Sequence, residues 1–292
     1  MGFWSRIVHG LVKKTSNYKA IATQKRFPHL GIRLSYRGKS FSGFQWQKNA
    51  PSIQAEVERT LGILFRRNIR ISFTSRTDAG VNAYDQWIFV RNGLRLFRKL
   101  SKLQQKKFLI SFNAISSKEI MAWQLLRLSS KFQPKENIKW KEYEYRILVS
   151  PFEDPLSKDY TWWIRGPLNL KIIRQSAKLL TGEHDFTGFA KSSRASGRSG
   201  VRKIIALRIL IQKHPILART YFLIFRFRAT GFLHHMARNI TGTLIDLGLG
   251  KRHDLSEILR VKDRKLSGRN APPHALSLFR TYVEDRFFQV LG

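Results

Sequence analysis

Residues Ser75–Ala83 have the sequence SRTDAGVNA and place one carboxylate, that of Asp78, between Arg76 and a glycine turn. The segment 69–74 before them alternates apolar and polar residues and predicts a strand, so Asp78 is expected on a tight turn directly after it. This aspartate has two interpretations. It caps its own turn through the backbone, or an arginine holds it ionised and directs it at a substrate.

The chain around this carboxylate is strongly basic. It has 292 residues, with 54 Lys+Arg against 19 Asp+Glu and a formal net charge of +35. Such a surface repels itself unless a polyanion neutralises it, and each neutralised phosphate releases counterions. Hydrophobic residues make up 42%, with 21 Phe and 7 Trp, which indicates a globular protein rather than a disordered basic tail. We therefore expect a nucleic acid partner, RNA before DNA; a solvated basic surface or membrane adhesion is the alternative.

The sequence excludes sites that need cysteine, and it argues against a membrane-spanning segment and against a histidine metal site. The absence of cysteine excludes disulfides, thiolate zinc sites and cysteine nucleophiles. We expect no membrane insertion, because the sequence has no apolar run of about 18 residues. The adjacent His234 and His235 are expected to point to different faces of a helix, which argues against a metal site.

The N-terminal segment differs from the rest in composition. The first acidic residue is Glu56, and Phe3, Ile7, Val8 and Leu11 follow helical spacing among basic residues. This pattern is typical of an organellar transit segment, and the alternative is a retained arm that contacts RNA. We treat residues 1–29 as a basic extension and expect a mitochondrial protein. A plastid or another organelle is the alternative, and the cytoplasm is less favoured.

Periodicity along the chain predicts an α+β fold with open antiparallel sheets. Strands are predicted at 30–36, 69–74, 86–91, 141–149, 203–212 and 220–229. Helices are predicted from residue 51 to 64, within 94–108, and at 170–180 and 232–247. A boundary is expected near residues 132–140, where Pro, Lys and Asn gather.

Two further residues are candidates for function. Arg238 is expected on the helix face opposite a leucine stripe, either as a surface phosphate contact or as the partner of a buried carboxylate, which its guanidinium suits better than lysine would. Tyr143 and Tyr145 share one side of their predicted strand. They form either a core pair or a stacking platform for an RNA base.

A series of motifs in the same order resembles those of the TruA-type tRNA pseudouridine synthase family, from about Leu30 to Tyr282. SRTDAGVNAYDQ is similar to the GRTDAGVHAxxQ signature of that family. YRGKSFSGFQWQ resembles its opening motif, which contains Gln45 and Gln47 here. The other similar segments are SIQAEVERTL, Phe112-Asn113, KEYEY, LLTGEHDFTGFA, ATGFLHHMARNITGTLIDLGLG and DRKLSGRNAPPHALSL.

The resemblance implies a two-lobed pseudouridine synthase fold, with antiparallel sheets flanked by helices and a basic cleft between the lobes. Residues 30–135 would form the N-terminal catalytic lobe with the aspartate, and residues 136–292 the C-terminal lobe with the tyrosine and arginine. It implies isomerisation of uridine to pseudouridine in structured RNA by base flipping. It also implies no cofactor, no metal and, often, a homodimer.

The resemblance assigns roles to individual residues. Asp78 matches the catalytic aspartate, a nucleophile or in competing schemes a base. Tyr143 matches the tyrosine that packs on the target base, and Arg238 the arginine that pairs with the aspartate. RNA contacts are expected from Arg76, Gln45, Gln47, Asn82, Lys131, Phe132, Lys141 and His234.

Several positions depart from the family pattern, although the Asp, Tyr and Arg are kept. Ser75 replaces a glycine, Asn82 a histidine, and Lys131 and Lys141 replace arginines, which loses bidentate phosphate geometry. Two hypotheses therefore remain. The first is an active pseudouridine synthase acting on tRNA or organellar rRNA. The second is a catalytically silent RNA-binding component of a mitochondrial ribosomal subunit, or a factor that binds an assembly intermediate.

Overall fold

The computed structural model describes residues 27–97, 101–191, 199–251 and 253–291. The strands are β1 His29–Tyr36, β2 Ser72–Phe73, β3 Asn82–Val90, β4 Ile120–Leu128, β5 Ile138–Val149, β6 Trp162–Ile164, β7 Gly182–Asp185, β8 Val201–Lys213, β9 Tyr221–Ala229, β10 Leu276–Val283 and β11 Phe288–Leu291. The α-helices are α2 Ile53–Phe65, α3 Lys102–Ile115, α4 Pro134–Asn137, α5 Leu170–Leu179, α6 Met236–Gly248 and α7 Leu255–Val261. Short 3-10 helices lie at Gly93–Leu96, Phe186–Phe189, Arg264–Leu266, Pro273–Ala275 and Asp285–Phe287.

The strands of the described residues form one continuous sheet. Its order is β11-β4-β1-β3-β10-β5-β9-β8-β7, with β2 beside β3 and β6 beside β5. Most neighbours are antiparallel, but β10 runs parallel to β3, where Ser277 pairs with Asn82 and Leu278 with Ala83. The other edge of β10 is antiparallel to β5. This last long strand therefore joins the strands of the first half of the chain to those of the second.

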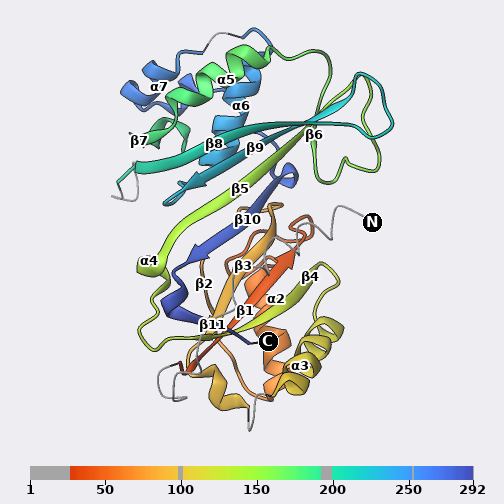
Figure 1. Cartoon of the computed structure of the whole chain (residues 1–292), viewed down its shortest axis with the longest axis vertical. Helices are drawn as coiled ribbons and strands as arrows, with labels where there is room; N and C mark the ends of the chain where they lie inside the picture. The colour runs from red at the N-terminus through yellow and green to blue at the C-terminus, as the bar shows by residue number, and fades with distance from the viewer. Residues whose placement is uncertain (1–26, 98–100, 192–198, 252, 292) are drawn as a thin grey trace.

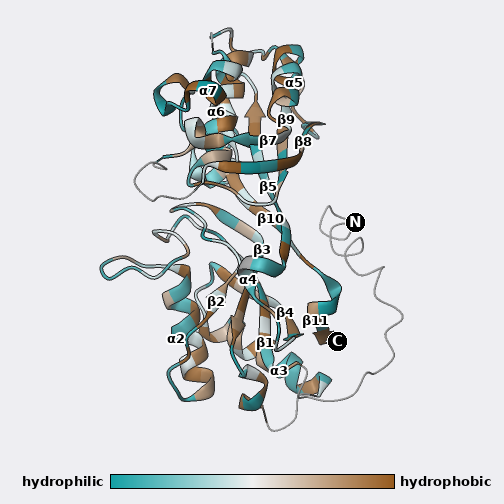
Figure 2. Cartoon of the chain, turned by 90° about the vertical axis from the view of Figure 1, so that its left-hand side faces the viewer, coloured by the Kyte–Doolittle hydropathy of each residue, from teal (hydrophilic) through white to brown (hydrophobic). Residues whose placement is uncertain are grey.

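The longer helices lie toward the two ends of an elongated molecule, with α5, α6 and α7 at one end and α2 and α3 at the other, while the short α4 lies between them (Figure 1). Figure 2 shows the same separation from the side. One buried hydrophobic cluster extends through both ends and includes Leu61 of α2, Phe112 of α3, Tyr145 of β5 and Leu244 of α6. The two lobes thus share a core that runs along the sheet.

The expected α+β fold with two lobes is confirmed, with one difference. The sheets of the two lobes are not separate, because β10 covers an edge of both β3 and β5 and so removes two edges that would otherwise stay unpaired. β11 also returns to the first half, where Phe288 pairs with Leu128 of β4. The division at residues 135 and 136 stays a prediction, as does the extension 1–29, of which residues 1–26 lie outside the described residues.

Most predicted strands and helices lie where the periodicity places them, but their bounds differ. The strand expected at 69–74 pairs with β3 only at Ser72 and Phe73. The strand expected at 86–91 begins earlier, at Asn82, and the helix expected within 94–108 is a 3-10 helix followed by α3. Ser101 starts α3 with a capping box to Gln104. None of the helices described is long and apolar enough to span a membrane.

Helix α6 differs most from its prediction. It was expected from residue 232 but begins at Met236, because His235 before it has a φ of +63° and turns the chain out of the helical path. Its side chains are buried on nearly all sides rather than along one leucine stripe. A helix that is packed all round cannot present a solvent face, and this changes the position of Arg238.

Candidate active site

Asp78 lies on the turn between β2 and β3. The Val81 N–H donates to the Asp78 carbonyl at 3.1 Å, and Gly80 has a φ of +75°, which favours glycine. Gln86 of β3 fixes the start of the loop, because its side chain accepts from the Ser75 N–H at 3.2 Å and donates to the Ser75 carbonyl at 2.6 Å. The Asp78 side chain is partly buried, with 18% of it exposed.

One face of β5 carries Lys141, Tyr143 and Tyr145. This face extends from the loop of Asp78 to the segment that contains Pro272. Lys141 Nζ donates to the carbonyl of Thr74, at the start of the loop, at 2.6 Å. The Tyr145 hydroxyl donates to the carbonyl of Pro272 at 2.8 Å. Tyr143 lies between the two, and all three share a face because strand side chains alternate. Strand β5 thus holds both sides of the site at once.

Tyr143 is the residue of β5 that the Asp78 carboxylate influences. Its ring packs edge-on against Phe232, with centroids 4.8 Å apart. Burial raises the pKa of the Tyr143 hydroxyl, and the nearby Tyr36 and Asp78 raise it further. This tyrosine is therefore neutral at physiological pH and can donate a hydrogen bond or pack on a base. Tyr145, fully buried, is a core residue.

Arg238 reaches Asp78 from the first turn of α6. Its Nε donates to the Ala271 carbonyl at 2.7 Å, and its Nη1 lies 3.6 Å from Asp78 Oδ2. The residue is 8% exposed, so the interpretation as a surface phosphate contact is wrong. The face opposite the leucine stripe is covered by residues 264–272, and the arginine pairs with a partly buried carboxylate instead.

His234 and His235 complete the surroundings of Asp78. Their Nε2 atoms lie 3.4 Å from Oδ1 and 3.6 Å from Oδ2 of the carboxylate, and the ring centroids are 4.2 Å apart. The expectation that they point to different faces of a helix is wrong. Both residues precede α6, and the left-handed backbone at His235 brings the two rings to the same side.

In this cluster, burial and the neighbouring positive charges act in opposite directions on the pKa of Asp78. Burial raises the pKa of the Asp78 carboxyl above its ordinary value, while His234 and Arg238 lower it again in part. For His235, burial and then Arg238 lower the pKa to about 3. His235 is therefore a neutral imidazole. The Asn270 side-chain Nδ2 donates to its Nδ1 at 2.9 Å, and its Nε2 lies 3.3 Å from Arg238 Nη1.

The first prediction concerns His234, which is exposed but closest to the carboxylate. In a reaction that needs ionised Asp78, activity falls as the pH drops through the raised pKa of this group. Removing His234 removes the largest influence that lowers this pKa. We expect His234→Ala to move the acid limb of the kcat profile to higher pH, measured from pH 4 to 8 against His184→Ala as a control. An unchanged limb would show that His234 does not influence Asp78.

Asp78, His234 and His235 also offer three atoms of the kind that bind metals, all within 4.8 Å of one another. Arg238 lies in the same place, however, 3.6 Å from Asp78 Oδ2 and 3.3 Å from His235 Nε2. A fixed guanidinium there repels a second cation. The expectation of no metal and no cofactor stays a prediction.

The residues expected to contact RNA fall into two groups. Arg76 and His234 are exposed beside Asp78, and Gln45 and Gln47 are exposed on the 37–50 loop. Asn82 is 6% exposed, and its amide already accepts from the Gly38 N–H and donates to the His274 carbonyl. Both polar atoms of its side chain are thus bonded within the protein, and its predicted RNA contact stays a prediction.

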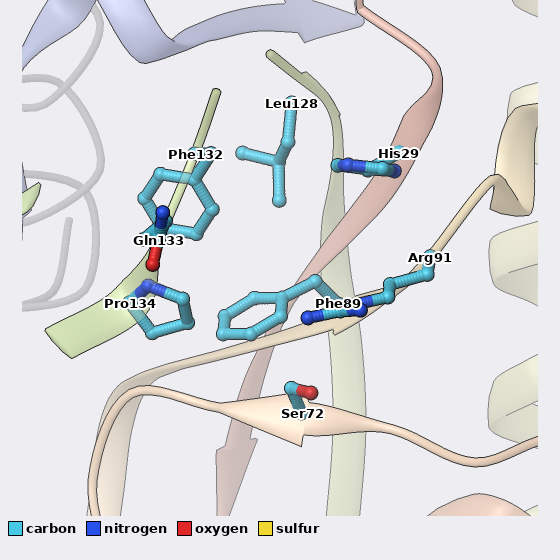
Figure 3. A pocket seen from close by; sticks show the side chains of 8 residues that line it. All are labelled: His29, Ser72, Phe89, Arg91, Leu128, Phe132, Gln133 and Pro134. Carbon is cyan, nitrogen blue, oxygen red and sulfur yellow. The ribbon is translucent and has the colours of Figure 1, made fainter. Parts of the chain in front are cut away.

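Lys131 and Phe132 lie elsewhere, at the far end of β3. Trp87 and Phe89 alternate with the residues of β3 that face the main core, so they pack on the opposite face of the strand, together with Phe132. Phe132 is 7% exposed and its ring packs against Phe89 and Phe287, and its predicted RNA contact stays a prediction. Lys131 is exposed next to it. Phe132 lines a cavity of about 80 Å³ with Arg91 at its rim (Figure 3).

Lys141 and two residues missed by the sequence reasoning act as supports. Burial lowers the pKa of the Lys141 amine to about 8, and its bond to Thr74 makes it a tie to the aspartate loop. Gln86, the last residue of the SRTDAGVNAYDQ stretch, clamps that loop. In the sequence, His235 is a candidate only for a metal site, and its left-handed backbone has no signal there.

Comparisons of the sequence with known proteins find a matching family and relatives that cover most of the chain. The tRNA pseudouridine synthase family matches residues 176–282. A protein of Leptospira biflexa, named tRNA pseudouridine synthase A, is 31% identical over 264 residues, 88% of this chain and 95% of that protein. One of the same name from Geobacillus kaustophilus is 34% identical over 255 residues, 86% of this chain and 93% of its own.

Among solved structures, one of a Cbf5-Nop10-Gar1 complex has a TM-score of 0.38 and 13% identity, covering 88% of this chain and 50% of that chain. This likeness is too low to carry an argument. The relatives extend over most of the chain, well beyond the residues of the site. By this similarity the chain belongs to the TruA-type tRNA pseudouridine synthases, a family of isomerases.

Proposed function

We propose that the protein converts uridine to pseudouridine in tRNA, with Asp78, Tyr143 and Arg238 as its catalytic residues. The observation that carries the proposal is the ion pair of Asp78 with Arg238 next to the buried Tyr143, where both halves of the sheet meet. The names of the relatives support tRNA as the substrate. The net charge of +35 supports a polyanionic partner.

Each of the three residues has a distinct part in the proposed reaction. The Asp78 carboxylate attacks C1′ of the flipped uridine while the C1′–N1 bond breaks, and Arg238 keeps it ionised. The freed uracil turns beneath Tyr143, and its C5 then bonds to C1′ as the carboxylate leaves. Loss of the proton on C5 and uptake of a proton at N1, which kept the electron pair of the broken bond, complete the product. The numbers of atoms and electrons are unchanged, so no cofactor is needed.

The test is tritium release from RNA that carries [5-³H]uridine, because the C5 hydrogen is lost only on isomerisation. Transcripts of tRNA and of ribosomal RNA are offered separately to the purified protein. Release from tRNA alone establishes the proposed substrate, and release from ribosomal RNA alone corrects it. Tight binding without release from either transcript would contradict the proposed activity and favour a silent RNA-binding component.

The second prediction is that RNA binding weakens steeply with salt. Each phosphate neutralised by Lys or Arg contributes a slope of about 0.9 in the log–log plot for duplex nucleic acid. We expect the affinity for tRNA to fall about 1000-fold or more between 50 and 200 mM salt. Filter binding at several salt concentrations measures it. A flat response would mean that the basic surface is not the RNA-binding surface.

Location and assembly are further parts of the proposal. We propose a mitochondrial protein, supported by the absence of Asp and Glu before Glu56, and tested by the location of a tagged full chain.

A homodimer that holds one RNA is tested by light scattering with and without tRNA. Association with an organellar ribosomal subunit or assembly intermediate is tested by co-sedimentation at physiological salt.

A further inference from the structure

Asp246 is a buried carboxylate that the proposed reaction does not use. It is 3% exposed and lies eight residues after Arg238 on α6, about 12 Å along the helix axis. Its Oδ2 accepts from the Arg269 backbone N–H at 3.2 Å, and its Oδ1 accepts from Arg269 Nε at 2.8 Å. Lys251 Nζ lies 3.2 Å away. A carboxylate so enclosed is costly unless it fixes something.

What Asp246 fixes is the segment 268–272, which lies directly on α6. The Gly268 N–H donates to Thr243 Oγ1 at 2.8 Å. A Cβ on Gly242 would stand 1.7 Å from the Arg269 carbonyl oxygen, so the backbone of the segment touches the backbone of the helix. With glycine on both sides, no side chain separates helix and segment, and Asp246 sets where the segment lies.

The other end of the same segment holds the guanidinium of Arg238. The Ala271 carbonyl accepts from Arg238 Nε at 2.7 Å, and the Ala271 N–H donates to the Arg238 carbonyl at 3.4 Å. Asn270 contacts His235 at 2.9 Å. The direction of the Arg238 side chain toward Asp78 therefore depends on the position of the Ala271 carbonyl group, and Ala271 is two residues after Arg269.

We infer that Asp246 is a positioning residue, which fixes Arg269 and the segment 268–272 so that the Ala271 carbonyl directs Arg238 at Asp78. The inference rests on the proposed function for its effect on turnover, but its geometry does not. Asp246 touches neither Asp78 nor a substrate, and it acts only through the segment.

The charge state of Asp246 suits this role. Burial alone would raise the pKa of this carboxyl, but the bonds from Arg269 and Lys251 hold it below its ordinary value. His253 Nε2 also faces it, at 3.7 Å from Oδ2. Asp246 therefore loses its proton at lower pH than Asp78, so the two titrations can be distinguished.

A role in stability alone must be separated from positioning. We compare Asp246→Asn with Glu58→Gln, which weakens another buried carboxylate, bonded to Arg70 and to the Ile71 N–H on the other lobe. Both variants are expected to lower the melting temperature. Only Asp246→Asn is expected to lower kcat, by about 10-fold to 100-fold, with KM for tRNA changed little, since a misplaced group costs rate rather than binding.

A second measurement reports on Asp78 without turnover. The groups facing Asp78 are Tyr143, Lys191, His234, His235 and Arg238. If Arg238 turns away, one influence that lowers the pKa of Asp78 is lost. We expect a carboxyl ¹³C NMR titration of Asp78, assigned with Asp78→Asn, to give a higher Asp78 pKa in Asp246→Asn than in the wild type. In Glu58→Gln the Asp78 pKa should be unchanged.

Arg269→Met serves as the reciprocal variant, because the Arg269 side chain is 41% exposed and its loss leaves no cavity in the core. It should reproduce both effects, and the double variant should be no worse than either single one. An unchanged Asp78 pKa in both single variants would overturn the inference. If the wild type shows no turnover but the Asp78 pKa is still higher in Asp246→Asn and Arg269→Met, the proposed function is overturned and the positioning role stands.

Discussion

Asp78→Asn is expected to abolish tritium release while leaving tRNA affinity within a few-fold of the wild type. The amide keeps the size of the side chain but cannot act as a nucleophile, and a loss of about 1000-fold or more is typical when a covalent catalyst is removed. RNA affinity should persist because phosphate contacts by exposed Lys and Arg dominate it. Single-turnover tritium release with excess protein measures the rate, and filter binding measures affinity.

The same variant should not lose stability. Burial raises the pKa of Asp78, so at neutral pH the ionised group is less favourable in the folded chain than in the unfolded one. Asparagine removes that cost, and the melting temperature should stay equal or rise. Asp154→Asn, on an exposed loop, is the matched control and should keep full turnover. A joint loss of folding and RNA binding in Asp78→Asn would instead mark Asp78 as a structural residue.

Arg238→Lys is expected to lower kcat by about 100-fold, although the charge is kept. The guanidinium donates from Nε to Ala271 and directs Nη1 at Asp78, and one ammonium group cannot reach both. A lysine that satisfies either partner leaves the other without a donor in a buried place. Tritium release over a range of tRNA concentrations separates kcat from KM.

A matched substitution tests whether the geometry or the residue type matters. Arg226 of β9 also pairs with a buried carboxylate, since its Nε donates to Glu144 at 2.8 Å, but it does not contact Asp78. Arg226→Lys should therefore keep nearly full turnover. Equal losses in the two variants, or near-normal rates in Arg238→Lys, would contradict the role assigned to the fork of Arg238.

Local patterns in the sequence were sufficient for much of the fold. The alternation in β5 and β9 predicted strands, and the stripe of α2 with Ser52 before it predicted a helix, because these signals depend on near neighbours. The pattern failed at α6, where helical spacing continues upstream of its true start. A left-handed residue such as His235 follows from the packing around it and not from its own sequence.

The site itself was predicted as a set of residues but not as an arrangement. Asp78 and Arg238 were singled out, and the motif around each made them candidates. Their meeting requires β10 to pair with both β3 and β5, a contact between segments separated by about two thirds of the chain. Phe132 lies in a motif that predicted an RNA contact, and its packing with Phe89 could not be read from the sequence.

The sequence by itself determined the basic character of the protein, the strand-and-turn setting of Asp78, and the identity of the residues that can do the chemistry. These are properties of composition and of short stretches of chain. Only the tertiary structure decided that the two lobes share one sheet, that both histidines face the carboxylate, and that Asp246 and Arg269 fix the carbonyl that directs Arg238. These features arise from contacts between distant segments, which packing selects and which local preferences do not encode.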